Sequence, residues 1–424
     1  MTPVRWRICG LLFFATTLSY IDRAILAVLK PLLEREMHWS QIDYGWMVTV
    51  FQLTYAIGYV FAGRLIDRVG VRWGFLSSVG LWSLATMEHA AARTVTGFNI
   101  ARAWLGLTEG GMFPAAIRTV AEWYPKEERA LATGLFNTGS NIGAMTCPLI
   151  VPWLALRWGW QTAFLVMGAV GLCWVVGWML LYHEPGKHPG VSAVELAYIR
   201  KDPPAPRVEI PWRRLLRHPQ TWAFVAGMTT SAPIWWFYIF WAPDFLNKRY
   251  ALSLTQSSLP LTIMFLSASG GGVGGGWLSS MLLKRGWTVN AARKIAMLVC
   301  VLCVLPVLAT PLVPHPWMAV TLVGLAAAAH CGFAANLFTL VSDTVPQQAV
   351  SSVVGIGGMG GALGGMAFAQ LVSRILYLTN NNYIIPFALA PLAYLMGLGV
   401  IHLLLPHLEP MKLDATRGPQ DVVT

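Results

Sequence analysis

ICGLLFFATTLSYIDRAILAVL, residues 8–29, is the first long apolar stretch of the chain, and only Asp22 and Arg23 interrupt it with charge. The hydrocarbon core of a bilayer is about 30 Å thick, and a helix needs about 20 apolar residues to cross it. The stretch therefore predicts a transmembrane helix. We do not expect a cleaved signal peptide, because the charges lie inside the stretch and Lys30-Pro31 follows without a small-residue cleavage pattern.

Composition extends this reading to the whole chain. Of its 424 residues, 56% are hydrophobic and 12% are charged, whereas a soluble domain carries about 25% charged residues. Eleven further stretches are long and apolar: 43–63, 74–92, 97–121, 131–153, 162–182, 219–246, 256–283, 295–313, 317–340, 351–377 and 384–405. We predict an all-α membrane protein with twelve transmembrane helices.

The net charge of +11 orients the chain and does not indicate a nucleic-acid partner. With the N-terminus in the cytoplasm, most of the 30 Lys and Arg residues fall on the cytoplasmic side. The outer side holds seven of them: Lys30, Arg35, Arg93, Arg157, Lys248, Arg249 and Arg374. This is the positive-inside bias, so we expect both termini in the cytoplasm.

The chain divides into two similar halves. A Pro-rich, basic stretch at 183–217 follows the sixth span, so we expect a six-helix bundle at 1–182, a cytoplasmic linker, a second bundle at 218–405 and a cytoplasmic tail at 406–424. A shift of 221 positions lays Pro125, Gly134, Gly139 and Gly143 onto Pro346, Gly355, Gly360 and Gly364. A parallel repeat of six helices is the architecture of one large transporter class, with the substrate site near midplane between the halves.

A loop signature between the second and third spans makes the class more specific. Residues 63–72 read GRLIDRVGVR, in which Gly63, Asp67, Arg68, Gly70 and Arg72 fit the pattern G-x-L-x-D-R-x-G-x-R. This loop resembles the signature of the major facilitator superfamily. We expect a tight turn that acts as a gating loop, with Asp67 near a helix N-terminus and the arginines near helix C-termini or acidic partners. A degenerate copy follows the eighth span, with Ser280 in place of the acidic residue.

Further motifs resemble the anion–cation symporter branch of that superfamily: Tyr20-Ile-Asp-Arg23, the run from Arg102 to Gly111, and Phe136-Asn137. Within that branch, residues 233–241 and 355–366 look most like the hexuronate transporters. The resemblance implies a proton-coupled symporter, in a bacterial inner membrane, that imports an anionic sugar acid by alternating access. It also implies a monomer that needs no cofactor or metal.

Four charged residues inside the spans mark the expected site. Each charge near the bilayer centre costs about 2.5–3.5 kcal/mol, so such residues normally face a polar path. Helical rise places Arg23 and Arg102 at similar depth, with Glu109 two turns deeper on the same face as Arg102. We expect the two arginines to hold a carboxylate and Asp22 and Glu109 to carry protons. The alternative is an ion-pair cluster that only joins two helices.

The second half offers aromatic side chains at the same depth. Aligning Pro31 with Pro243 puts Trp235 and Trp236 opposite Arg23 and Ala24. An indole has an apolar face and one N–H donor, which suits a sugar ring. The alternative for the tryptophans is packing against lipid or an interfacial belt. Hydroxyl partners are expected among Tyr20, Tyr55, Asn137 and Asn336, and the alternative for these residues is hydrogen bonding between helices. His330, at the repeat position of Glu109, is expected to bond a substrate hydroxyl or a water, and the alternative is a bond to a neighbouring helix.

Other functions are less consistent with the sequence. A symporter or exchanger for another organic anion, such as an aldonate, glucarate, an aromatic acid or a phosphate ester, stays open. A membrane-embedded enzyme is disfavoured because no H-E-x-x-H motif is present, and the glycine runs at 270–276 and 355–365 follow no predicted strand. A membrane sensor would carry a soluble output domain, and we find none.

Overall fold

The computed structural model describes residues 3–202 and 211–411. Its longer helices are α1 (Val4–Met37), α2 (Gln41–Val69), α3 (Val71–Glu88), α4 (Val95–Glu109), α5 (Met112–Trp123), α6 (Lys126–Trp158), α7 (Trp160–Leu181), α10 (Pro219–Tyr250), α11 (Leu254–Lys284), α12 (Val289–Val304), α13 (Pro316–Thr344), α14 (Gln347–Leu378) and α15 (Ile384–Leu404). Short helices are η1 (His89–Ala91), η2 (Pro185–Lys187), α8 (Ala193–Ile199), α9 (Trp212–Leu215) and η3 (Leu305–Ala309). Within the described ranges the protein is helical and contains no strand.

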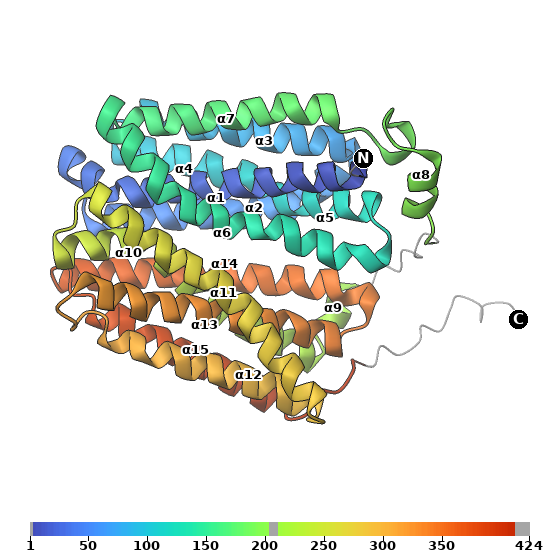
Figure 1. The fold of residues 1–424 in the computed structure, drawn as a ribbon. Helices are drawn as coiled ribbons and strands as arrows, with labels where there is room; N and C mark the ends of the chain where they lie inside the picture. The colour runs from blue at the N-terminus through green and yellow to red at the C-terminus, as the bar shows by residue number, and fades with distance from the viewer. Residues whose placement is uncertain (1–2, 203–210, 412–424) are drawn as a thin grey trace, which may run out of the picture.

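The helices form two bundles that lie against each other (Figure 1). In the N-terminal bundle, α1–α7, the main contacts join α1 with α6, α2 with α4 and α3 with α7. In the C-terminal bundle, α10–α15, they join α11 with α13 and α10 with α14 and α15. Contacts of α2 with α14 and of α6 with α11 hold the bundles together. Two helical bundles packed against each other, as expected from the sequence, are therefore present.

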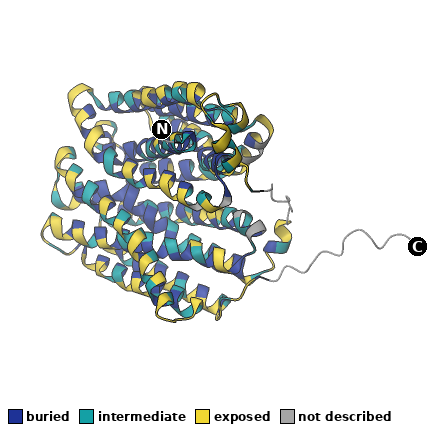
Figure 2. Ribbon diagram, turned by 45° about the vertical axis from the view of Figure 1, so that its right-hand side comes forward, coloured by how far each residue is buried: buried dark blue, intermediate teal, exposed yellow. Residues whose placement is uncertain are grey.

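The surface of the bundles suits a bilayer. Buried residues lie inside and between the bundles, and the outward helix faces are exposed (Figure 2). Large apolar side chains on those faces include Leu180, Leu403, Leu378 and Val273. Exposed apolar surface of this extent marks contact with a membrane. The chain is a multi-pass membrane protein.

Nine helical segments in the described part of the chain are long and apolar enough to cross a membrane: those in α1, α2, α6, α7, α10, α12 with η3, α13, α14 and α15. The other three expected spans coincide with α3, with α4 and α5 together, and with α11. The total of twelve spans stays a prediction.

The fourth expected span, 97–121, is two helices instead of one. α4 ends at Glu109, Gly110 and Gly111 follow, and α5 begins at Met112. A Cβ atom on Gly110 would lie 2.5 Å from the backbone nitrogen of Tyr59, and one on Gly111 would lie 2.7 Å from Oγ of Ser78. The two glycines thus let the chain pass close to α2 and α3, and Glu109 ends the helix that carries Arg102.

The sequence predicts a loop with a tight turn over 63–72, and this prediction is wrong because most of that stretch is helical. α2 continues to Val69, and Gly70, with φ of 82°, joins it directly to α3. The turn is one residue long, because α3 begins at Val71. Only glycine adopts the backbone angle of Gly70 without strain. The polar residues after Gly63 lower the local hydropathy, but they do not end the helix. Gly63 lies within α2, and the Asp67 side chain lies outside the described part of the structure.

Candidate functional site

The centre of the interface holds an ion pair between Arg23 on α1 and Glu109 at the end of α4. Nε of Arg23 donates to Oε1 of Glu109 at 2.7 Å, and both side chains are buried. Ser19, one helical turn before Arg23, donates its hydroxyl to the same oxygen. Oε2 of Glu109 and Nη2 of Arg23 have no partner in the described protein. Each member of the pair therefore keeps one buried polar atom free for another ligand.

Aromatic rings surround the Arg23 guanidinium. Its Cζ lies 4.5 Å from the ring centre of Tyr55, 4.9 Å from Tyr20 and 5.5 Å from Trp236. Trp236 comes from the C-terminal bundle, and all three rings are only partly buried. A cation within about 6 Å of a ring centre is attracted to the ring face. The rings thus hold the charge of Arg23 at the interface between the bundles.

Arg102 is fully buried, yet none of its three side-chain nitrogens has a hydrogen-bond partner among the described residues. Its Cζ lies 4.4 Å from the ring centre of Phe51, and that of Arg23 lies 5.7 Å from the same ring, so the two Cζ atoms are at most about 10 Å apart. Phe240 of the C-terminal bundle lies 5.9 Å away. A buried charged group left unpaired is strongly destabilising, so this guanidinium is a candidate for ligand binding.

Asp22 does not lie in the same group as Arg23. The sequence predicts one wall of Asp22, Arg23, Arg102 and Glu109, but neighbouring helix residues point about 100° apart. The Asp22 carboxylate is buried with both oxygens unpartnered. The side chains of Thr86 and Trp82 on α3 lie close to this carboxylate, and the charge of Glu109 also acts on it. Asp22 therefore faces α3 inside the N-terminal bundle.

The C-terminal bundle contributes Trp235 and His330 beside Trp236. The ring of His330 on α13 stacks on Trp235 of α10, with ring centres 5.0 Å apart and planes 8° apart. Nδ1 of His330 lies 2.6 Å from the hydroxyl of Tyr394 on α15. Of the two predicted tryptophans, Trp236 lies beside Arg23, whereas Trp235 packs against His330 inside the C-terminal bundle.

The two predicted asparagines lie apart from this group. Nδ2 of Asn336 donates to the carbonyls of Gly275 and Gly332, so Asn336 joins α11 and α13. Asn137 is exposed on α6, and its side chain makes no hydrogen bond to a described residue. The packing alternative thus describes Asn336 better than a substrate contact does.

Within the described residues, the hydrogen bonds and ion pairs between the bundles run from the distal end, away from the termini, to Met145 near the middle of α6. Lys30, expected on the outer surface, is buried within α1, and its Nζ lies 2.6 Å from Oδ1 of Asp244 on α10. Tyr383 and Gln41 donate to Oδ2 of Asp244. Further bonds between the bundles join Tyr44 to Phe240, Thr49 to Gln370, Glu34 to Lys248, Gln41 to Asn381 and Met145 to Thr262.

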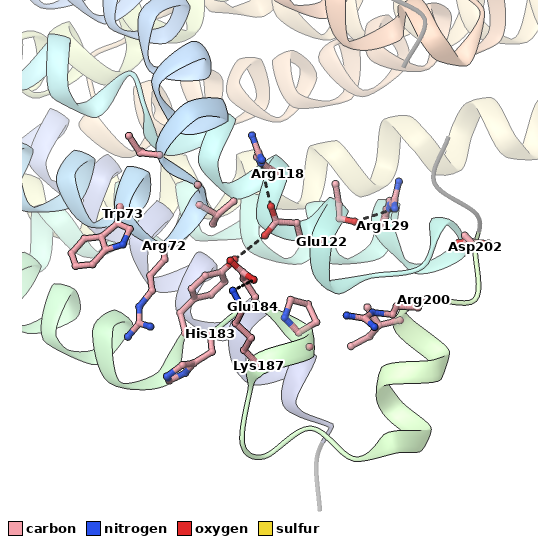
Figure 3. Close-up of a pocket in the computed structure, with 18 residues that line it drawn as sticks. Arg72, Trp73, Arg118, Glu122, Arg129, His183, Glu184, Lys187, Arg200 and Asp202 are labelled. Carbon is pink, nitrogen blue, oxygen red and sulfur yellow. Dashed lines mark hydrogen bonds and ion pairs between the residues drawn. The ribbon is translucent and has the colours of Figure 1, made fainter. Parts of the chain in front are cut away.

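The residues of the predicted gating loop lie at the other end. A cleft of about 1000 Å³ there is lined by Gly70, Arg72, Arg118, Glu122, Arg200 and their neighbours (Figure 3). Nη2 of Arg72 donates to the carbonyl of Met179 in the last turn of α7. The Tyr182 hydroxyl donates to Glu122, and burial, then that carboxylate, raises the pKa of Tyr182. The cleft contains none of the central charged residues; Arg68, exposed at the end of α2, is not among its lining residues.

Sequence reasoning missed several residues of the centre. Ser19 was recognisable, because it lies one turn before Arg23 on the same helix face. Phe51, Phe240, Tyr394 and the Lys30–Asp244 pair come together only through tertiary packing. No group of three His, Cys, Asp or Glu side chains in the described chain is arranged to hold a metal ion.

Comparison with known proteins gives a consistent picture. Residues 12–369 match the family model of the Major Facilitator Superfamily. The hexuronate transporter of Escherichia coli (strain K12) is 28% identical over 380 residues, which cover 88% of each chain. The galacturonate transporter of Dickeya chrysanthemi is 31% identical over 299 residues, which cover 69% of this chain and 86% of the relative. A bacterial homologue of the human lysosomal transporter Spinster, solved in an inward-facing and occupied conformation, superposes with a TM-score of 0.71 at 18% identity and 96% coverage of both chains.

Proposed function

Because the chain belongs to the Major Facilitator Superfamily and is a transporter, not an enzyme, we propose that it imports an anionic sugar acid, a hexuronate first among the candidates, together with protons. The observation that carries the proposal is the Arg102 guanidinium, fully buried and unpartnered beside the half-satisfied Arg23. We place the protein in a bacterial inner membrane with both termini in the cytoplasm.

The charge and shape of the centre support a sugar acid. A carboxylate between Arg23 and Arg102 accepts charge-assisted hydrogen bonds from nitrogens that otherwise lack partners. Trp236 supplies an apolar face for the ring beside Arg23, and partly buried Tyr20 and Tyr55 supply hydroxyl groups near Arg23. In this arrangement the N-terminal bundle binds charge and the C-terminal bundle binds the ring.

The Arg23–Glu109 pair supports proton coupling. A substrate carboxylate and the Glu109 carboxylate compete for the same guanidinium, since Glu109 occupies Nε of Arg23 at 2.7 Å. Protonation of Glu109 removes its charge and releases Arg23 for the substrate. Asp22, buried without a described partner, is the second group that can carry a proton. Import of an anion then accompanies import of protons.

Another organic anion is the second candidate. Arginines recognise the carboxylate shared by hexuronates, aldonates and glucarate, and nothing in the charged part of the centre distinguishes among them. Trp236 favours a ring over an open chain, because the C–H face of a ring makes more contact with an indole face.

Proteoliposome uptake tests the proposal. We expect labelled glucuronate to accumulate when an inward proton gradient is imposed and only to equilibrate without one. Unlabelled galactonate and glucarate, added as competitors, rank the open-chain acids, and glucose serves as the neutral control. Equal competition by glucose would contradict carboxylate recognition, and accumulation independent of the proton gradient would contradict symport.

A further inference from the structure

His330 is held between two buried aromatic side chains. Its ring stacks on Trp235 at 5.0 Å, and its Nδ1 lies 2.6 Å from the Tyr394 hydroxyl. Tyr394 is fully buried and Trp235 nearly so. The ring can therefore neither rotate nor shift without losing a stacking contact and a hydrogen bond.

The Tyr394 hydroxyl decides which ring nitrogen carries hydrogen. Its only hydrogen-bond partner in the described chain is Nδ1 of His330. If Nδ1 carried hydrogen, the buried tyrosine hydrogen would have no acceptor, and buried polar hydrogens left unsatisfied are costly. Tyr394 therefore donates to Nδ1, and a neutral imidazole that accepts at Nδ1 carries its hydrogen on Nε2. The imidazolium form is excluded for the same reason: its Nδ1 carries hydrogen, which would leave the Tyr394 hydroxyl hydrogen without an acceptor.

Nε2 is the open end of the ring. It has no hydrogen bond to a described residue, and it is not among the fully buried atoms that lack partners. Trp236, next to Trp235, lies over Arg23. The Nε2–H group is thus a fixed donor on a ring that stacks on Trp235, and the next residue, Trp236, contacts the predicted carboxylate site.

We propose that Tyr394 is a positioning residue for substrate selection: it fixes His330 as an Nε2–H donor to one hydroxyl oxygen of the sugar acid. The inference rests on the proposed function. In it, His330 binds a hydroxyl of the substrate, whereas Arg23 and Arg102 bind its carboxylate. The 221-residue repeat places His330 in the position that Glu109 has in the first half. Equivalent positions in the two bundles then hold the proton-carrying carboxylate and the hydroxyl donor.

The test combines spectroscopy with a series of deoxy sugars. In nitrogen-15 spectra of ring-labelled histidines, the His330 signals are identified by their loss in His330→Gln. We expect Nδ1 without hydrogen and Nε2 with hydrogen in the wild type, and a gain of the Nδ1–H form in Tyr394→Phe. Tyr238→Phe is the matched control, because the Tyr238 hydroxyl is buried in the same bundle and has no described partner.

Uptake is then measured for a hexuronate and for analogues that each lack one ring hydroxyl. In the wild type and in Tyr238→Phe, we expect one analogue to have a half-saturating concentration about two- to tenfold above the parent, the range for one hydrogen bond. In Tyr394→Phe that difference falls below about twofold. His330→Gln combined with Tyr394→Phe recovers the difference, because a glutamine amide donates without help from Tyr394.

Hydrogen on Nδ1 in the wild type would overturn the proposal, as would an unchanged deoxy pattern in Tyr394→Phe. Failure of the proposed function looks different. In that case the wild type takes up no sugar acid, and the spectra alone decide the tautomer of His330.

Discussion

The buried pair of Lys30 and Asp244 predicts that one substitution changes the balance of conformations. The two side chains are 1% and 0% exposed and 2.6 Å apart, and they join α1 to α10 across the two bundles. Tyr383 and Gln41 complete the surroundings of the Asp244 carboxylate. Asp244→Asn keeps the size of this side chain and removes its charge. The substitution acts only on states in which the distal ends of the bundles meet.

The structure sets the size of the effect. Removing one partner of a buried ion pair costs about 3–5 kcal/mol, because the other charge is left buried. Lys30 retains Glu34, whose Oε2 lies 2.9 Å from its Nζ, so we take the lower value. About 3 kcal/mol corresponds to a shift of roughly 100-fold in the equilibrium between conformations. If nearly all wild-type molecules are closed at the distal end, a large share of the Asp244→Asn molecules will be open there.

Electron–electron distance measurements on spin labels at Arg35 and Tyr377 follow this change. Both residues are exposed, one at the end of α1 and the other at the end of α14. We expect the wild type to give one short distance and Asp244→Asn to add a longer one as a major component. Lys248→Gln is the control: it breaks a partly exposed pair with Glu34, which is worth at most about 1 kcal/mol. Identical distance distributions in Asp244→Asn and the wild type would refute the reasoning.

Three further predictions concern the centre. Asp22→Asn and Glu109→Gln should each abolish proton-driven accumulation, while at least one of them retains counterflow exchange, and wild-type accumulation in both would contradict their role. Arg23→Lys and Arg102→Lys should weaken binding of the sugar acid at least tenfold, about 1.4 kcal/mol, because an ammonium lacks the planar two-donor fork; calorimetry that shows unchanged affinity excludes that arginine from the site. His330→Gln should retain coupled uptake and His330→Ala should raise the half-saturating concentration, and loss of coupling in the glutamine variant would make His330 a proton carrier.

Apolar length predicted the helices well because the membrane imposes it. The stretch expected at 219–246 is α10 (Pro219–Tyr250), and the one at 317–340 is α13 (Pro316–Thr344). The same signal failed where a helix leaves the expected apolar region: hydropathy ends near Gly63, whereas α2 ends at Val69. Hydropathy reports where a chain meets lipid, and helix ends depend on turns and caps, such as the capping box that Ser40 and Asp43 form at the start of α2.

The centre was predictable as far as helical periodicity reaches. The charges of Arg23, Arg102 and Glu109 stood out because the membrane makes each of them costly. The sequence predicted that Arg23 and Arg102 hold a carboxylate together, but it did not predict that Arg23 pairs with Glu109. That pairing depends on how α1 crosses α4. Tyr394 and Asp244 lie far in sequence from their partners, His330 and Lys30. A single polar residue in an apolar segment does not indicate which residue of another helix it will contact.

In the proposed transport cycle, the two ion pairs on α1 have different roles. Arg23 and Lys30 are seven residues apart, two helical turns or about 10 Å along the helix. The partner of Arg23, Glu109, belongs to the same bundle, so a substrate carboxylate can replace it without separating the bundles. The partner of Lys30, Asp244, belongs to the other bundle, so that pair must break before the distal end can open. Trp236 contacts Arg23 and lies eight residues before Asp244 on α10, which links both pairs to the same two helices. In the proposed transport cycle, occupancy at Arg23 and closure at Lys30 thus act on the same pair of helices.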